Sequence, residues 1–148
     1  MIRRNMAGPR PPERVYTRPL VEKLGVKPGA RVTIVDVPDP ALRELLAERT
    51  DDVTEGEPKP STDLIFLGAD SIDELARLPE LRARLRLDGA IWVVSRKGRA
   101  ATLRDVDVIE AAIAAGLVDN KVVSFSDTHT SLRLVIPRHL RPPESGGG

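Results

Sequence analysis

Three short apolar runs, separated from one another by helical patterns, constrain the fold of this chain more than any other feature. They are Arg31–Asp36 (RVTIVD), Thr62–Ala69 (TDLIFLGA) and Ala90–Ser95 (AIWVVS). Strands that are apolar throughout are typical of a parallel sheet covered by helices on both faces, because a sheet with one solvated face would alternate apolar and polar residues. The sequence therefore predicts an α/β fold with a doubly wound, Rossmann-like, mostly parallel sheet.

Helical patterns fill the intervals between these runs. A short helix ends at Gly25, and a second begins at Asp39, a side-chain acceptor that directly precedes a proline. A third begins at Ser71, which has capping-box spacing with Glu74, and Pro79 is expected to kink or split it.

The last third of the chain predicts a helix followed by an antiparallel hairpin. Thr102 and Asp105 have capping-box-like spacing, so the helix is expected to begin near Leu103 and to end at Gly116. Two strand-like segments, NKVVSFSD and SLRLVIPR, then flank a turn at residues 128–130. The predicted buried side of the helix consists of Val106, Ile109, Ile113 and Leu117.

A single domain is expected over residues 15–140. Residues 1–14 contain prolines and arginines with almost nothing to bury, and they predict a disordered basic arm. Residues 141–148 (RPPESGGG) predict a disordered tail. A weak edge strand is expected at residues 51–55.

Composition narrows the classes of function. With 23 basic and 22 acidic residues and 3% aromatic residues, the chain has neither the charge nor the exposed rings that favour nucleic-acid binding. It contains no cysteine and two histidines, and no apolar run approaches the roughly 20 residues of a membrane span. We therefore expect a cytoplasmic bacterial protein with no metal site, no membrane contact and no nucleic-acid partner.

The segments LRARLRLDGAIWVV and EAAIAAGLVDNKVV are similar in order and pattern to the later half of class I S-adenosylmethionine methyltransferases. About 120 residues more closely resemble a bacterial domain-of-unknown-function family, number three thousand and fifty-two. The motifs that carry this second resemblance are KLGVKPGARV, SRKGRAATLRD and AAGLVDNKVVSFSDTHTSL. The resemblance implies a methyltransferase-like fold.

The turn after the first strand departs from the methyltransferase pattern. Dinucleotide and S-adenosylmethionine folds place a glycine-rich turn there, whereas this chain has VPDP, which contains no glycine and two prolines without an N–H. No cofactor is therefore expected, and S-adenosylmethionine enters only under the alternative of a divergent methyltransferase. Glu55, 19 residues after Asp36, lies where a ribose-binding carboxylate would fall, although a solvated acid at a strand end has the same pattern.

Ligands of open α/β sheets bind beyond the carboxyl ends of the strands. The segments at those positions are Val37–Asp39, Gly68–Asp70 and Ser95–Leu103. The third is basic and precedes a helix start, which is a good environment for an anion, but the same residues would also suit a solvated turn. The candidate anion ligands are Arg96, Lys97, Arg99 and Thr102.

Asp127 and Thr128 are secondary candidates, since they lie in the polar segment SDTHTS of the hairpin. Asp127 could orient His129 as a proton shuttle, although both Asp127 and Thr128 also form turns readily. The sequence favours a non-catalytic binding or regulatory module for a small anionic ligand or a protein partner. A divergent methyltransferase and a nucleic-acid-associated protein that uses the basic arm are the alternatives.

Overall fold

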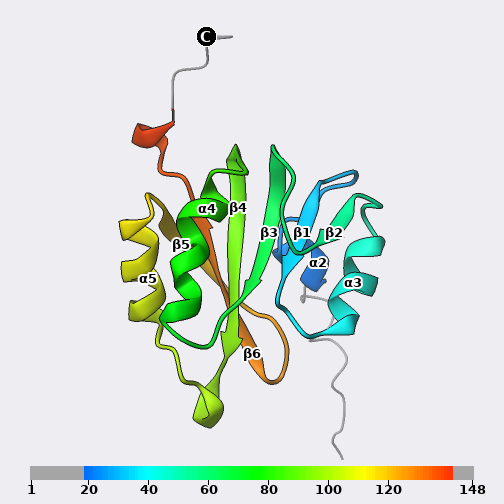
Figure 1. Cartoon of the computed structure of the whole chain (residues 1–148). Coiled ribbons are helices and arrows are strands. Elements are labelled where there is room, and N and C mark those ends of the chain that lie inside the picture. Colours follow the sequence, from blue (N-terminus) through cyan, green and yellow to red (C-terminus); the bar gives the residue numbers. More distant parts are fainter. Residues whose placement is uncertain (1–18, 142–148) are drawn as a thin grey trace, which may run out of the picture.

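The computed structural model describes residues 19–141, so the predicted arm at 1–14 and the tail beyond residue 141 lie outside the described residues. Six strands form one sheet in the order β2-β1-β3-β4-β6-β5 (Figure 1). Neighbouring strands from β2 to β4 are parallel, and β6 runs antiparallel to both β4 and β5. The strands are β1 (Val32–Val35), β2 (Val53–Glu55), β3 (Thr62–Gly68), β4 (Leu85–Arg96), β5 (Val118–Ser124) and β6 (His129–Val135).

Helices cover both faces of this sheet, which confirms the predicted doubly wound α/β class (Figure 1). None of the helices within residues 19–141 is both long enough and apolar enough to cross a bilayer. The α-helices are α2 (Leu20–Lys23), α3 (Pro40–Ala47), α4 (Leu78–Arg82) and α5 (Asp105–Ala114). Short 3-10 helices are η1 (Asp73–Arg77), η2 (Gly98–Ala100) and η3 (Arg138–Leu140).

Alternate side chains of the central strands pack into two separate cores. On one face Ile65 and Ile91 pack with side chains of η1, α4 and α5. On the other face Phe66 and Trp92 pack with side chains of α2 and α3. Trp92 is fully buried, and its indole N–H donates to the carbonyl of Leu24 at 3.0 Å, which joins α2 to the middle of the sheet. Both faces of β3 and β4 are thus closed to solvent.

The predicted helix start at Asp39 is confirmed by its hydrogen bonds, and the predicted start at Ser71 is confirmed in part. The Asp39 carboxylate accepts from the N–H of Ala41 at 3.0 Å, and a proline opens α3. Ser71 and Glu74 form half of the expected capping box: the Ser71 hydroxyl accepts from Glu74 N–H at 3.2 Å, but Glu74 Oε1 accepts from the N–H of Asp70, at 2.7 Å, instead of that of Ser71. The helix that follows, η1, begins at Asp73. Pro79 lies at the change from η1 to α4, so the predicted split is also present.

The start of α5 differs from the prediction, and its buried side differs in part. The helix begins at Asp105 rather than near Leu103, and its cap is Arg104, not Thr102. The N–H of Arg104 donates to Asp107 Oδ2 at 3.0 Å, and the hydrogen bonds from Arg104 lower the pKa of the Asp107 carboxyl. Two of the four predicted buried residues are confirmed, since Leu117 is buried and Ile109 is partly buried against the core. The other two, Val106 and Ile113, are 43% and 64% exposed. The fully buried residues of α5 are Val108 and Ala112.

The turn of the hairpin also differs from the prediction. Strand β6 begins at His129, and the connection to β5 covers residues 125–128 rather than 128–130. The predicted antiparallel pairing itself is present, with Val122 opposite Leu132.

Substitutions on α5 test which of its side chains are buried against the core. We expect Val108→Ala to lower the free energy of unfolding by about 2 kcal/mol, because two buried methyl groups are lost and a cavity is left. Val106 is 43% exposed, so Val106→Ala is expected to change stability by less than about 0.5 kcal/mol. Urea unfolding of the two variants measures the difference, and a larger cost for Val106→Ala would contradict the observed phase.

Candidate ligand-binding edge

The three segments predicted beyond the strand ends meet at one edge of the sheet. They follow β1, β3 and β4, whose carboxyl ends lie side by side because these strands are parallel. Three depressions of about 350, 270 and 330 Å³ lie there, and Val37 and Pro38 line all three. We call the residues that line these depressions the carboxyl edge; it lies at the lower end of the strands in Figure 1.

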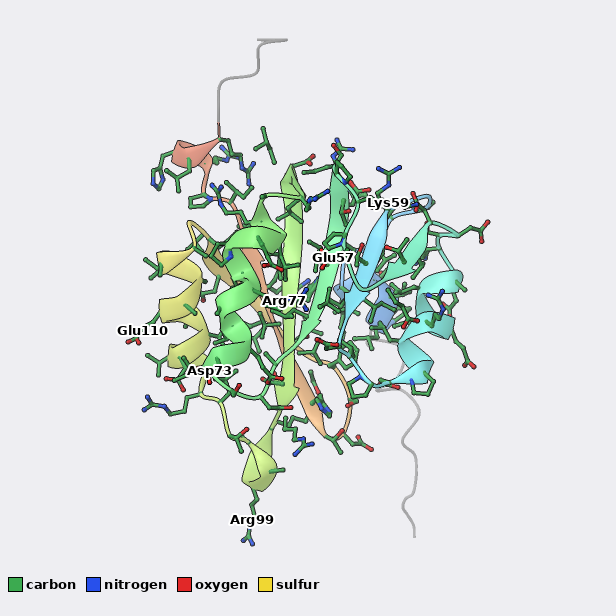
Figure 2. The ribbon with its side chains drawn as sticks, viewed as in Figure 1. Glu57, Lys59, Asp73, Arg77, Arg99 and Glu110 are labelled. Carbon is green, nitrogen blue, oxygen red and sulfur yellow. The ribbon has the colours of Figure 1, made fainter. Side chains whose placement is uncertain are left out.

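The turn after β1 passes very close to the end of β3. Asp36 has a φ of 57°, in the left-handed region, and its carbonyl is so near Gly68 that a Cβ there would overlap it. The Asp36 carboxylate lies 3.5 Å from Arg77 Nη1, and Arg77 also lies 3.8 Å from Glu57 (Figure 2) and 3.4 Å from Glu80. Left-handed backbone is costly for a residue with a Cβ. The ion pair of Asp36 with Arg77 links this turn to η1.

Carboxylates dominate the lining of the carboxyl edge. The lining also includes one arginine, Arg96, and one histidine, His129. Carboxylate oxygens accept hydrogen bonds from donors such as hydroxyl groups, and three of the six carboxylates also have an arginine partner. The six carboxylates are those of Asp36, Asp39, Glu55, Asp70, Glu74 and Asp127.

The depression beside the hairpin has an apolar floor. Val37, Val94 and the buried ring of Phe125 line it, and His129 borders it. Nδ1 of His129 lies 2.8 Å from the Thr128 hydroxyl. The hypothesis that Asp127 orients the imidazole through Nδ1 is therefore wrong, because the partner of Nδ1 is the Thr128 hydroxyl.

The secondary candidates Asp127 and Thr128 both line this depression. Both side chains are exposed, and the Thr128 carbonyl accepts from the N–H of Lys97 at 3.0 Å. The hairpin turn and the end of β4 are thereby joined.

Two residues of the predicted anion loop contact Asp70. The Arg96 N–H donates to Asp70 Oδ1 at 2.9 Å, and Arg96 Nε lies 3.8 Å from Oδ2. The hydroxyl of Thr102 donates to the Asp70 carbonyl at 2.6 Å, so it joins the loop to the end of β3 instead of capping α5.

The other two residues point elsewhere. Lys97 Nζ donates to the Ser124 hydroxyl at 2.7 Å, whereas Arg99 is exposed and extends away from the domain (Figure 2). Arg96, Lys97, Arg99 and Thr102 therefore do not converge on one point. The hypothesis of an anion site in this loop depends on Lys97 and Arg99, and it stays a prediction.

Asp36 and Phe125 line the edge but were missed as site residues from the sequence. Asp36 directly follows a buried strand, and treating every acid at a strand end as a lining residue would have found it. The position of Phe125 depends on the hairpin register, which includes an irregularity between Asp119 and Lys121 that no sequence pattern signals.

The sequence of the chain matches a known protein family. A family model described as "Protein of unknown function (DUF3052)" matches residues 21–138. The chain belongs to this family. No curated protein matches the chain in sequence.

Several solved structures share the fold of this DUF3052 chain, and one of them is named as a methyltransferase. An S-adenosylmethionine-dependent methyltransferase from Aquifex aeolicus is 17% identical with a TM-score of 0.60, covering 85% of this chain and 89% of that one. The pyocyanin biosynthetic protein PhzM is 11% identical with a TM-score of 0.60, and the match covers 79% of this chain and 53% of PhzM. Fibrillarin from Aeropyrum pernix, in complex with natively bound S-adenosylmethionine, is 14% identical with a TM-score of 0.50, and the match covers 76% of this chain and 69% of fibrillarin.

These likenesses support the Rossmann-like, methyltransferase-like fold expected from the sequence. At these identities they establish the fold alone. The chain spans about half the length of PhzM.

Gly68→Ala tests the close approach that shapes the edge. We expect a loss of roughly 2 kcal/mol or more, because the new Cβ overlaps backbone that cannot move without displacing the turn. Gly98→Ala is the matched control: its φ is 70° but no atom lies within 4 Å of the added Cβ. It is expected to cost about 1 kcal/mol, from left-handed backbone alone. Equal losses in urea unfolding would contradict the packing of Asp36 against Gly68.

Proposed function

We propose that this DUF3052 protein is a binding module for a nucleoside of the S-adenosylmethionine class, held at the carboxyl edge. The observation that carries the proposal is the acidic lining of an edge that open α/β sheets use for ligands. The shared fold with S-adenosylmethionine-dependent methyltransferases supports this choice of ligand.

Charge favours this ligand over the small anion that the sequence suggested. S-adenosylmethionine carries a positively charged sulfonium, and the methyl group on that sulfur is the one that it supplies in methyl transfer. Three of the six carboxylates have arginine partners: Asp36 pairs with Arg77, Glu55 with Arg43 and Asp70 with Arg96. Asp39, Glu74 and Asp127 have no ion pair within residues 19–141, so they leave the edge with a net negative charge.

Glu55 suits a ribose. It ends β2 beside the carboxyl end of β1, and it lines one depression together with Asp36. Its side chain is 60% exposed, and its ion pair with Arg43, at 3.5 Å, leaves acceptor capacity for hydroxyl donors. A carboxylate about 20 residues beyond the first strand is the ribose ligand of dinucleotide-binding folds.

The turn after β1 suits only part of this ligand. Pro38 and Pro40 have no N–H, so the turn offers fewer backbone donors to a carboxylate than a glycine-rich turn does. Arg96 is the single arginine at the edge that could receive the carboxylate of the methionine part. The residues present therefore match the ribose and the sulfonium better than the amino-acid end, and the proposal concerns binding.

Calorimetry with S-adenosylmethionine, S-adenosylhomocysteine and adenosine tests the proposal. We expect S-adenosylmethionine to bind more tightly than S-adenosylhomocysteine, since only the former carries the positive sulfonium. Glu55→Gln is expected to weaken both about tenfold, because one charge-assisted hydrogen bond is worth roughly 1.5 kcal/mol.

Glu48→Gln is the matched control, since Glu48 is an exposed acid at the end of α3 that lines none of the three depressions. It is expected to leave the dissociation constants unchanged. No heat from any of the three nucleosides at millimolar concentration, or equal affinity in wild type and Glu55→Gln, would refute the proposal.

A further inference from the structure

A fourth depression lies at the opposite, amino-terminal edge of the sheet. It has a volume of about 340 Å³ and is formed by the turn before β1, the start of β3 and the first half of β4. Unlike the carboxyl edge, it is lined by more cations than carboxylates: three against two. Its charged residues are Lys27, Asp63, Arg86, Asp88 and Arg133.

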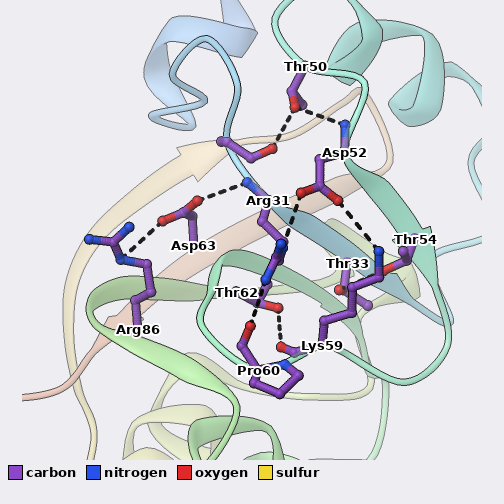
Figure 3. A network of polar contacts seen from close by, with 11 residues as sticks. Arg31, Thr33, Thr50, Asp52, Thr54, Lys59, Pro60, Thr62, Asp63 and Arg86 are labelled. Carbon is purple, nitrogen blue, oxygen red and sulfur yellow. Dashed lines mark hydrogen bonds and ion pairs between the residues drawn. The ribbon is translucent and has the colours of Figure 1, made fainter.

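Both carboxylates of this depression already have cationic or N–H partners. Oδ2 of Asp63 accepts from the backbone N–H of Arg31 at 2.8 Å, and its Oδ1 lies 3.4 Å from Nε of Arg86 (Figure 3). The same Nε of Arg86 lies 3.3 Å from Asp88. Arg86 therefore balances part of the charge of Asp63 and Asp88, and neither acid has a contact with Arg133.

Arg133 is a cation of this depression that has no carboxylate partner within residues 19–141. It is half-buried, and burial lowers the pKa of its guanidinium. Within residues 19–141 its one polar side-chain contact is the amide oxygen of Asn120, at 3.3 Å. Lys27, at the mouth, is exposed and has no polar side-chain contact within the same residues.

A partly desolvated guanidinium without a carboxylate is an unfavourable arrangement for a protein alone. An oxyanion would relieve it, because guanidinium groups bind carboxylate and phosphate through paired hydrogen bonds. The depression is partly lined by Gly25 and Gly29, and no atom lies within 4 Å of a Cβ added at either residue.

We propose that this depression is a second ligand site, in which Arg133 with Lys27 and Arg86 binds a carboxylate or phosphate group of a small molecule. This site lies at the other end of the sheet from the carboxyl edge, and it does not depend on the nucleoside proposal.

Thermal unfolding in phosphate, in acetate and in chloride at matched ionic strength tests this site. We expect phosphate or acetate to raise the Tm by about 2–4 °C over chloride once its concentration reaches about five times the dissociation constant. The salt that gives the larger rise identifies the preferred oxyanion.

Arg133→Gln is expected to abolish the rise while leaving the Tm in chloride equal to or above that of the wild type, because a desolvated charge is removed. A purely structural arginine would instead lower the Tm in chloride. Lys27→Gln, at an exposed position where folding is not at risk, is expected to reduce the rise.

Arg84→Gln is the charge-matched control, because Arg84 is exposed, lies just before β4 and does not line the depression. It is expected to keep the full rise, as is the double variant Lys97→Ala, Arg99→Ala, which removes two cations of the basic loop. No rise beyond chloride, an equal rise in Arg133→Gln, or loss of the rise in the loop variant would overturn the proposal.

Discussion

Burial of both faces of the central strands is the constraint on which the rest of this structure depends. Phe66 and Trp92 are fully buried on one face, and Ile65 and Ile91 are fully buried on the other. Side chains in the middle of these strands therefore cannot reach solvent or a ligand. Polar chemistry is confined to the two edges where the strands begin and end, and the connecting turns decide what each edge can bind.

The two edges differ in charge, although the chain as a whole is nearly neutral. The carboxyl edge has six carboxylates and one arginine, whereas the depression at the amino-terminal edge has three cations and two carboxylates. A formal net charge of +1 conceals this separation. This difference in charge between the two edges is a local effect of which loops meet at each edge, and the composition of the chain does not reveal it.

The apolar runs and capping residues predicted the fold because both are local signals: Asp39 caps its helix wherever the sheet lies. The candidate site was harder to predict, because its residues depend on which loops meet. Arg96 and Thr102 both contact Asp70, a residue about 30 positions away in the chain. The α5 start was mispredicted since the Arg104–Asp107 cap competes with the Thr102–Asp105 spacing, and Thr102 bonds across the edge instead.

Amide chemical-shift mapping of the labelled protein with S-adenosylmethionine tests the central claim, that the acidic carboxyl edge is the nucleoside site. We expect the largest shifts on residues 36–39 and 55–56, and no shifts on residues 27–30 and 86–90 at the amino-terminal edge. Shifts concentrated at residues 27–30 and 86–90, or no saturable shifts at millimolar ligand, would contradict it.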